Sequence, residues 1–256
     1  MTFPQPATSA YVPNVTTEGT GRPLVLVPGL DGTGRLFYRQ VPLLAREFRV
    51  ATYALRDSAP DMQTLVEDLA SVVRELGNGE PAVIVGESFG GTLAMSFTLA
   101  HPDLVRALVV VNSFPYFRPH YRLRLAVAAL GLVPWGVMAI VRRLTAFRLH
   151  SRYTHRHELE RFLRETGFTT REGYISRLKI LQQYDVRERL HEVNVPTLFL
   201  AADQDHLVPS VKQATYMVAQ VPHGRLRILE GHGHICLIAP NLDLRHILSE
   251  WQFGAA

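Results

Sequence analysis

Short apolar runs alternate with longer amphipathic segments along this 256-residue chain, and this alternation constrains the fold more than any other feature. The apolar runs have the length and β-branched content of buried strands, and they cover residues 24–27, 50–55, 81–85, 107–111, 197–201 and 226–229. Helical spacing covers residues 62–76, 88–100, a segment from 210, and 242–251. Because parallel strands need crossover connections, this order predicts an α/β fold with a mostly parallel, doubly wound sheet and helices on both faces.

The alternation stops in the middle of the chain. Residues 115–193 have helical spacing and no convincing strand. The sequence therefore predicts a core built from residues 1–114 and 194–256, with residues 115–193 inserted as a helical cap or lid. This inserted part is called the cap segment below.

Cysteine content and motif spacing exclude several classes of protein. The single cysteine, Cys236, rules out internal disulfides and cysteine-based zinc or iron–sulfur sites. The glycines at positions 29, 32 and 34 miss the GxGxxG spacing of dinucleotide sites, so we expect neither a cofactor nor a metal. The first 15 residues lack a basic patch followed by an apolar stretch, which predicts a cytoplasmic protein.

Positive charge is concentrated in the cap segment. Residues 115–164 hold ten arginines and only two acidic residues, Glu158 and Glu160, although the whole chain has a net charge of only +4. Such a block attracts nucleic acid, anionic lipid or an acidic partner, but most often it is a solvated helical face without a partner. No helix-turn-helix, zinc-finger or RNA-binding strand motif accompanies it, so we expect no nucleic-acid partner.

An uncharged apolar stretch at residues 125–141 lies within this basic block. It reaches only the lower length limit of a membrane span, and Gly131 and Pro134 interrupt it, which argues against a span. Three interpretations remain: an ordinary helix pair buried on the core, a cover over a hydrophobic substrate tunnel, or an apolar surface that rests on anionic membrane. Trp135 and Met138 are the candidate substrate contacts in this stretch.

A GxSxG pattern, formed by Gly86, Ser88 and Gly90, stands between a predicted strand and a predicted helix. In such a turn the serine is held in a strained conformation with its hydroxyl above the sheet, and the small neighbours let strand and helix approach closely. The helix that follows presents unpaired amides and a partial positive charge to a developing oxyanion. Position and pattern together make Ser88 a candidate nucleophile.

A serine nucleophile needs a histidine base that a carboxylate orients, and the two late strands offer both. The loop after residue 201 offers Asp203 and Asp205, and the loop after residue 229 offers His232 and His234. We favour Asp205 because an apolar turn at 207–209 follows it, and His234 because it opens the last helical segment. The other member of each pair is expected to stabilise its loop.

Three segments resemble the α/β-hydrolase fold superfamily: GESFGG at 86–91, ADQDHLVP at 202–209 and GHGH at 231–234. LVLVPGLDGTG at 24–34 looks like the first strand-to-helix loop of that family, which supplies half of the oxyanion hole. The resemblance implies that the backbone amides of Leu30 and Phe89 are the oxyanion donors and that the cap follows the sixth strand. The same loops are similar to the hydrolase part of the phytyl ester synthase-like esterase and acyltransferase group.

The expected activity is hydrolysis of a carboxylic ester or thioester with an apolar acyl or alcohol part, a small-molecule substrate whose acyl length the sequence does not indicate, through an acyl-serine intermediate. Ser88 attacks, His234 acts as general base and then general acid, and Asp205 orients the imidazole. Two alternatives share this triad: acyl transfer to a lipid alcohol, and a ligand receptor with little turnover. A peripheral contact of the basic cap with anionic membrane is a further expectation, whereas the sequence does not indicate an oligomeric state.

Overall fold

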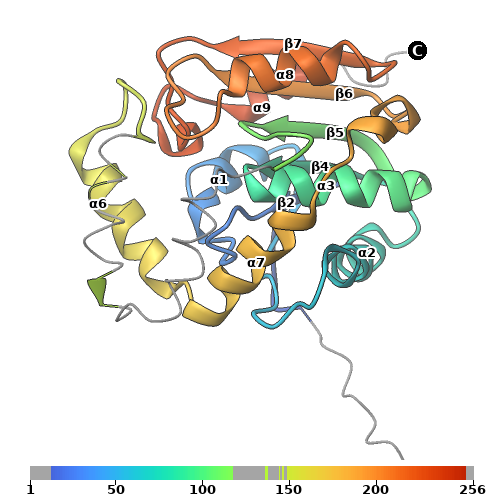
Figure 1. The fold of residues 1–256 in the computed structure, drawn as a ribbon, viewed down its shortest axis with the longest axis horizontal. Coiled ribbons are helices and arrows are strands. Elements are labelled where there is room, and N and C mark those ends of the chain that lie inside the picture. Colours follow the sequence, from blue (N-terminus) through green and yellow to red (C-terminus); the bar gives the residue numbers. More distant parts are fainter. Residues whose placement is uncertain (1–12, 118–135, 138–143, 145, 147–148, 252–256) are drawn as a thin grey trace, which may run out of the picture.

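One seven-stranded sheet runs through the described part of the chain, in the strand order β1-β3-β2-β4-β5-β6-β7 (Figure 1). The computed structural model describes residues 13–117, 136–137, 144, 146 and 149–251. The strands are β1 (Val15–Glu18), β2 (Arg22–Val27), β3 (Phe48–Tyr53), β4 (Ala82–Glu87), β5 (Val105–Val111), β6 (Thr197–Ala202) and β7 (Gly224–Leu229). Only β1 pairs antiparallel, with β3. The predicted α/β fold with a mostly parallel sheet is confirmed.

Helices cover both faces of this sheet, which explains why its central strands are apolar without alternation. The core helices are α1 (Gln40–Leu44), α2 (Met62–Gly77), α3 (Phe89–Ala100), α8 (Ser210–Val218) and α9 (Leu244–Trp251). Successive residues of β2 enter opposite cores: Val25 belongs to the buried cluster that contains side chains of α2, α3 and α8, whereas Leu24 belongs to the cluster that contains side chains of α1 and α9. The sheet is therefore the middle of three layers.

The boundaries of α2 show how local sequence sets an element. The carboxylate of Asp61 accepts a hydrogen bond from the Thr64 amide and caps the first turn. Asn78 ends the helix in the left-handed conformation, with φ of 48°. The helix covers residues 62–77, one residue more than the sequence predicts.

The sequence analysis did not predict two short elements, β1 and α1. Strand β1 lies at the sheet edge with most of its side chains exposed, so it lacks the apolar run of a buried strand. Helix α1 has five residues, too few for a helical period to emerge.

The predicted position of the cap segment, after the sixth strand, is wrong. The segment follows β5, the fifth of the described strands, rather than the sixth. The reason is that only one antiparallel strand, β1, precedes β2 in the described part of the chain.

The described part of the cap segment contains α6 (Arg156–Glu165), α7 (Arg171–Gln183) and two short 3-10 helices, Thr166–Phe168 and Arg187–Glu192. Figure 1 shows α6 and α7 outside the sheet, along one side of the core. An isolated bridge between Tyr116 and Asp185 joins the chain where it leaves the core and where it returns.

Most of the apolar stretch at 125–141, including Trp135 and Met138, lies outside the described residues. Within the described ranges, no helix is both long enough and apolar enough to cross a bilayer. The cap boundaries at residues 115 and 193 stay a prediction.

A buried glutamine in α1 holds the last helical segment against the core. The side-chain amide of Gln40 donates to the carbonyls of Leu237 (2.8 Å) and Leu242 (3.0 Å), and its oxygen accepts from the Leu244 amide (3.0 Å). Gln40 has no exposed surface. Its hydrogen bonds fix the chain that follows the histidine loop.

Gln40→Leu is expected to lower the free energy of unfolding by about 2–4 kcal/mol, because it leaves three buried backbone groups without their partner. Urea unfolding measures the change as a shift of the midpoint. The matched control is Gln63→Leu, on the exposed surface of α2, which should change the midpoint little. Equal shifts for both variants would contradict the role of Gln40.

Candidate active site

Ser88 occupies a strained turn between β4 and α3. Its φ of 55° and ψ of −117° lie in a region that non-glycine residues rarely adopt. Two hydrogen bonds stabilise this conformation. The Ser88 amide donates to the carbonyl of Val111 (2.9 Å), and the Ser113 hydroxyl donates to the Ser88 carbonyl (2.7 Å). Ser88 stays partly exposed, whereas Glu87 and Phe89 on either side are buried.

The glycines beside Ser88 allow three backbones to meet. A Cβ atom on Gly86 would lie 2.2 Å from the carbonyl oxygen of Gly90, and one on Gly90 would lie 2.1 Å from the carbonyl oxygen of Val27. Both obstacles are backbone atoms, so no side-chain movement relieves them. The GxSxG pattern therefore reflects the close approach of β2, β4 and α3.

The three residues that the sequence favours lie in contact with one another. Nε2 of His234 lies 3.0 Å from Oγ of Ser88, and Nδ1 of His234 lies 2.7 Å from Oδ2 of Asp205. They come from the loops that follow β4, β6 and β7, at the shared carboxyl edge of the sheet. This geometry lets the imidazole accept the serine proton while the carboxylate holds its other nitrogen.

Asp205 is held as an anion. Its carboxylate accepts hydrogen bonds from the amides of Leu207 (2.9 Å) and Val208 (3.0 Å) and from the hydroxyl of Ser210. Burial opposes ionisation, but the hydrogen bond and charge of His234, together with the bonds from Ser210 and Val208, outweigh it and hold the pKa of Asp205 below its usual value. The apolar turn at 207–209 thus supplies the amides that fix the carboxylate.

The alternative candidates Asp203 and His232 have other partners instead. Oδ1 of Asp203 accepts from the Gly231 amide (2.7 Å). The ring of His232 lies 2.9 Å from the Ser151 hydroxyl through Nδ1 and 3.4 Å from the Asn241 side chain through Nε2. Neither residue has a hydrogen bond to Ser88 within the described part of the chain.

Asn112 fixes the histidine loop, and the sequence analysis missed it. It directly follows β5 with φ of 47°. Its side-chain oxygen accepts from the Ala202 amide (2.8 Å), and its nitrogen donates to the carbonyl of His234 (2.8 Å). The available signal was a polar residue directly after an apolar strand, at the edge that carries Ser88.

A tight turn at residues 29–32 lies beside Ser88, closed by a hydrogen bond from the Gly32 amide to the Gly29 carbonyl (3.0 Å). A Cβ atom on Gly29 would lie 3.9 Å from Cβ of Ser88, which shows how close the two turns approach. Among the described residues, the amides of Leu30 and Phe89 donate no hydrogen bond. The two amides that the resemblance points to therefore have no hydrogen-bond acceptor among the described residues.

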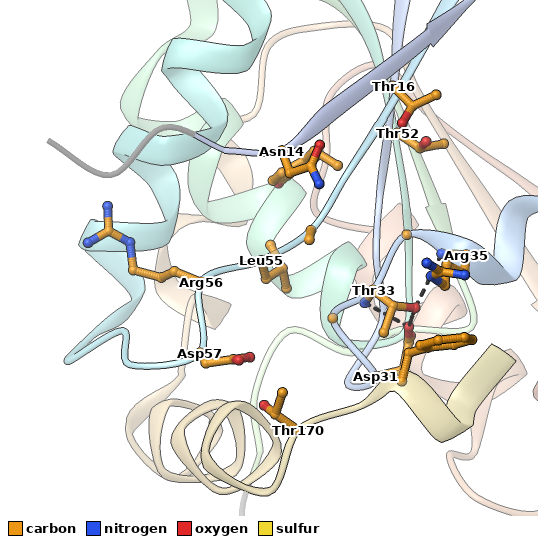
Figure 2. A pocket seen from close by; sticks show the side chains of 15 residues that line it. Asn14, Thr16, Asp31, Thr33, Arg35, Thr52, Leu55, Arg56, Asp57 and Thr170 are labelled. Atoms are coloured by element: carbon orange, nitrogen blue, oxygen red, sulfur yellow. Dashed lines mark hydrogen bonds between the residues drawn. The ribbon is translucent and has the colours of Figure 1, made fainter.

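A polar cavity of about 490 Å³ opens on residues 31–34 of this loop. Asp31, Thr33, Arg35, Asp57 and Thr170 are among its lining side chains (Figure 2). Oδ2 of Asp31 accepts from the amide and hydroxyl of Thr33, which stiffens the loop. None of Ser88, Asp205 and His234 lines this cavity. No group of three or more potential metal ligands occurs among the described residues.

Glu87, the residue before Ser88, is buried, and its Oε1 has no hydrogen-bond partner among the described residues. Burial raises the pKa of this carboxyl to about 8, and the nearby charges of Asp31 and Asp205 add to the effect. Glu87 is therefore mostly protonated at neutral pH.

Glu87→Gln is expected to gain stability relative to the unaltered protein as the pH rises from about 4.5 to about 8. In that window the unfolded chain releases the Glu87 proton and the folded chain keeps it, so ionisation favours unfolding by up to about 1.4 kcal/mol per pH unit. Glutamine cannot ionise and removes this slope. Urea unfolding at several pH values measures the difference, with exposed Glu80→Gln as the control. A stability difference that does not change with pH would refute the assignment.

Comparisons with known proteins identify the family of this fold. A family model described as alpha/beta hydrolase fold matches residues 22–239. The chain is 30% identical over 241 residues to "Putative carbamate hydrolase RutD" of Serratia proteamaculans (strain 568), a match that covers 89% of this chain and 90% of that protein.

Solved structures share the fold at lower identity. A thermophilic esterase from Thermogutta terrifontis superposes with a TM-score of 0.84 at 21% identity, over 96% of this chain and 95% of the other. An enol-lactonase from Burkholderia xenovorans LB400 gives a TM-score of 0.79 at 18% identity, over 93% and 95% of the two chains. From the family match over residues 22–239 and the sheet that carries Ser88, the chain belongs to the alpha/beta hydrolase fold family.

Proposed function

We propose that this hydrolase cleaves carboxylic esters or thioesters through an acyl-serine intermediate formed on Ser88. The observation that carries the proposal is the continuous contact from Oγ of Ser88 through His234 to Asp205, at 3.0 Å and 2.7 Å. A serine hydroxyl is a weak nucleophile at neutral pH, and a histidine at this distance can take its proton during attack. The ionised Asp205 stabilises the imidazolium that results.

The reaction proceeds in two steps in this proposal. Oγ of Ser88 forms a bond to the carbonyl carbon, the carbonyl oxygen becomes an oxyanion, and the amides of Leu30 and Phe89 stabilise it. Phe89 is the first residue of α3, so the positive end of the helix dipole lies at the same place. When the oxyanion collapses, the bond to the alcohol or thiol breaks and His234 protonates the leaving group. In the second step, water attacks the acyl carbon while His234 takes its proton. The bond to Oγ of Ser88 then breaks, the acid leaves, and His234 returns the proton to Ser88.

The apolar part of the substrate is inferred from the cap segment. The stretch at 125–141 is rich in leucine, alanine and valine, and Trp135 and Met138 are its proposed substrate contacts. Because most of this stretch lies outside the described residues, its substrate contacts and the contact with anionic membrane stay predictions from the sequence.

Carbamate hydrolysis is a second candidate, favoured by the name of the relatives that match most of this chain. A carbamate carbonyl can be attacked by the same serine and stabilised by the same amides. Because the attached nitrogen makes this carbonyl less electrophilic, its hydrolysis needs the oxyanion donors even more than ester hydrolysis does.

Ser88→Ala is expected to lower kcat for p-nitrophenyl esters by about four orders of magnitude or more, because it removes the nucleophile. The assay uses acyl chains from acetate to palmitate and p-nitrophenyl carbamate in parallel. Ser96→Ala, on the same helix α3, is the matched control and should keep full activity. Unchanged turnover in Ser88→Ala would refute the mechanism.

The pattern of substrate preference separates the candidates. Rates that rise with chain length support an apolar ester, whereas a carbamate faster than every ester supports the second candidate. Release of a new ester when a long-chain alcohol is added identifies acyl transfer. Tight binding without turnover in the unaltered protein identifies a receptor.

Asp205→Asn and Asp203→Asn form a second matched pair. Asp205→Asn should lower kcat by about 10²–10⁴, because the neutral amide neither fixes the imidazole nor stabilises its charged form. Asp203→Asn should leave kcat within about threefold, since Asp203 contacts the Gly231 amide rather than His234. Steady-state kinetics at neutral pH checks both, and equal losses would contradict the choice of Asp205.

A further inference from the structure

A buried arginine of the cap segment binds the turn that carries the Leu30 amide. Arg177 lies on α7 and only 1% of its surface is exposed. Its Nε donates to the carbonyl of Leu30 (2.9 Å), and its Nη2 donates to the carbonyl of Asp31 (3.0 Å). Charged side chains are rarely buried to this extent unless they are paired. The cap thus holds two successive carbonyls of the turn at residues 29–32.

The space for this guanidinium depends on two glycines, one in the core and one in the cap. A Cβ atom on Gly32 would lie 2.4 Å from Cζ of Arg177, and one on Gly173 would lie 2.8 Å from its Nη1. Gly32 also has φ of 71°, and Gly173 precedes Arg177 by one helical turn on α7. The pocket fits a planar guanidinium with several donors, whereas lysine offers only one point of contact.

The carboxylate of Asp57 lies near the guanidinium. Oδ1 of Asp57 is 3.8 Å from Nη1 of Arg177, and Asp57 lines the polar cavity shown in Figure 2. The two turn carbonyls on one side and this partly exposed carboxylate on the other are thus among the partners of the guanidinium.

The remaining contacts of the turn explain what Arg177 adds. The Gly32 amide donates to Gly29, the Gly32 carbonyl accepts from the Leu55 amide (2.8 Å), and the Asp31 carboxylate accepts from Thr33. The carbonyls of Leu30 and Asp31 are bound by Arg177. Without this donor, the carbonyls of Leu30 and Asp31 both lose their partner, and the bond from the Gly32 amide to Gly29 alone holds the Asp31–Gly32 peptide plane. A carbonyl that turned toward Ser88 would repel an oxyanion.

We propose that Arg177 is a positioning residue for the oxyanion hole, which holds the 29–32 turn so that the Leu30 amide stays oriented for the developing negative charge. The inference rests on the proposed serine mechanism. Its physical basis is preorganisation: a donor already fixed in place needs no reorganisation when the charge forms. A cap arginine then acts on the chemical step without touching the substrate.

The test compares Arg177→Met and Arg177→Lys with Lys179→Met, which removes a positive charge from the exposed surface of the same helix. Two rates are measured: hydrolysis of the best p-nitrophenyl ester, and modification of Ser88 by a fluorophosphonate, which also forms an oxyanion. Arg177→Met should lower kcat and the modification rate together, by about 10-fold to 100-fold, with KM within about threefold. Arg177→Lys should recover only part of the loss, and Lys179→Met should lose nothing.

Chemical rescue separates positioning from simple packing. In Arg177→Ala, guanidinium chloride well below unfolding concentrations should restore part of kcat, because the free ion can bind both carbonyls, whereas sodium chloride should not.

A second variant keeps Arg177 but narrows the space around its guanidinium. Gly173→Ala favours helix formation but puts a Cβ atom against the guanidinium and Asp57, so kcat should fall while helix content is kept. Gly167→Ala, where an added Cβ atom meets nothing within 4 Å, is the control.

The outcomes distinguish this inference from the proposed function. If Arg177→Met and the unaltered protein are modified at equal rates, or if only KM or the melting temperature changes, the positioning role is wrong. If the fluorophosphonate does not modify Ser88 in the unaltered protein, the proposed function fails and this inference fails with it.

Discussion

The close approach of three backbones around Ser88 is the constraint on which the rest of this site depends. A Cβ atom on Gly90 would lie 2.1 Å from the Val27 carbonyl, so β2, β4 and α3 meet at a distance that only glycine permits. The strained backbone of Ser88 persists because Val111, the last residue of β5, and Ser113, two residues later, form hydrogen bonds with it. Since the strands are parallel, the loops after β4, β6 and β7 open at the same edge, and Asp205 and His234 reach Ser88 from there.

The sequence predicted those parts of the molecule whose signal is local. Each central strand is a continuous apolar run, and Ser88, Asp205 and His234 lie in the turn or loop that follows such a run. Strand β1 was missed because an exposed edge strand has no buried face to mark it. The contacts of Asn112 and Arg177 depend on residues distant in the sequence, at Ala202 and His234 for the first and at Leu30 and Asp31 for the second. An arginine within a helix usually marks a solvated face, and only the folded chain shows that this one is buried.

The cap segment contacts the site from two directions. Arg177 binds the 29–32 turn on one side of Ser88. On the other side, the Ser151 hydroxyl accepts from the Gly233 amide (3.2 Å), and the Leu149 carbonyl accepts from the Ile235 amide (3.0 Å). A Cβ atom on Gly233 would lie 2.4 Å from the Leu149 carbonyl, so the histidine loop and the part of the cap segment that precedes α6 lie in close backbone contact. In this family member, the cap contributes to the geometry around Ser88 as well as lying beside the core.

Two carboxyl groups near Ser88 differ in charge because they differ in hydrogen-bond donors. Both are buried, but Asp205 receives bonds from two amides, a hydroxyl and His234, whereas Oε1 of Glu87 has no partner among the described residues. Donors that favour the anion lower the pKa of Asp205, and burial without them raises the pKa of Glu87 to about 8. This separation suits the proposed chemistry. The anion lies beyond the imidazole, where it stabilises positive charge, while the group next to the serine stays neutral and does not oppose the oxyanion.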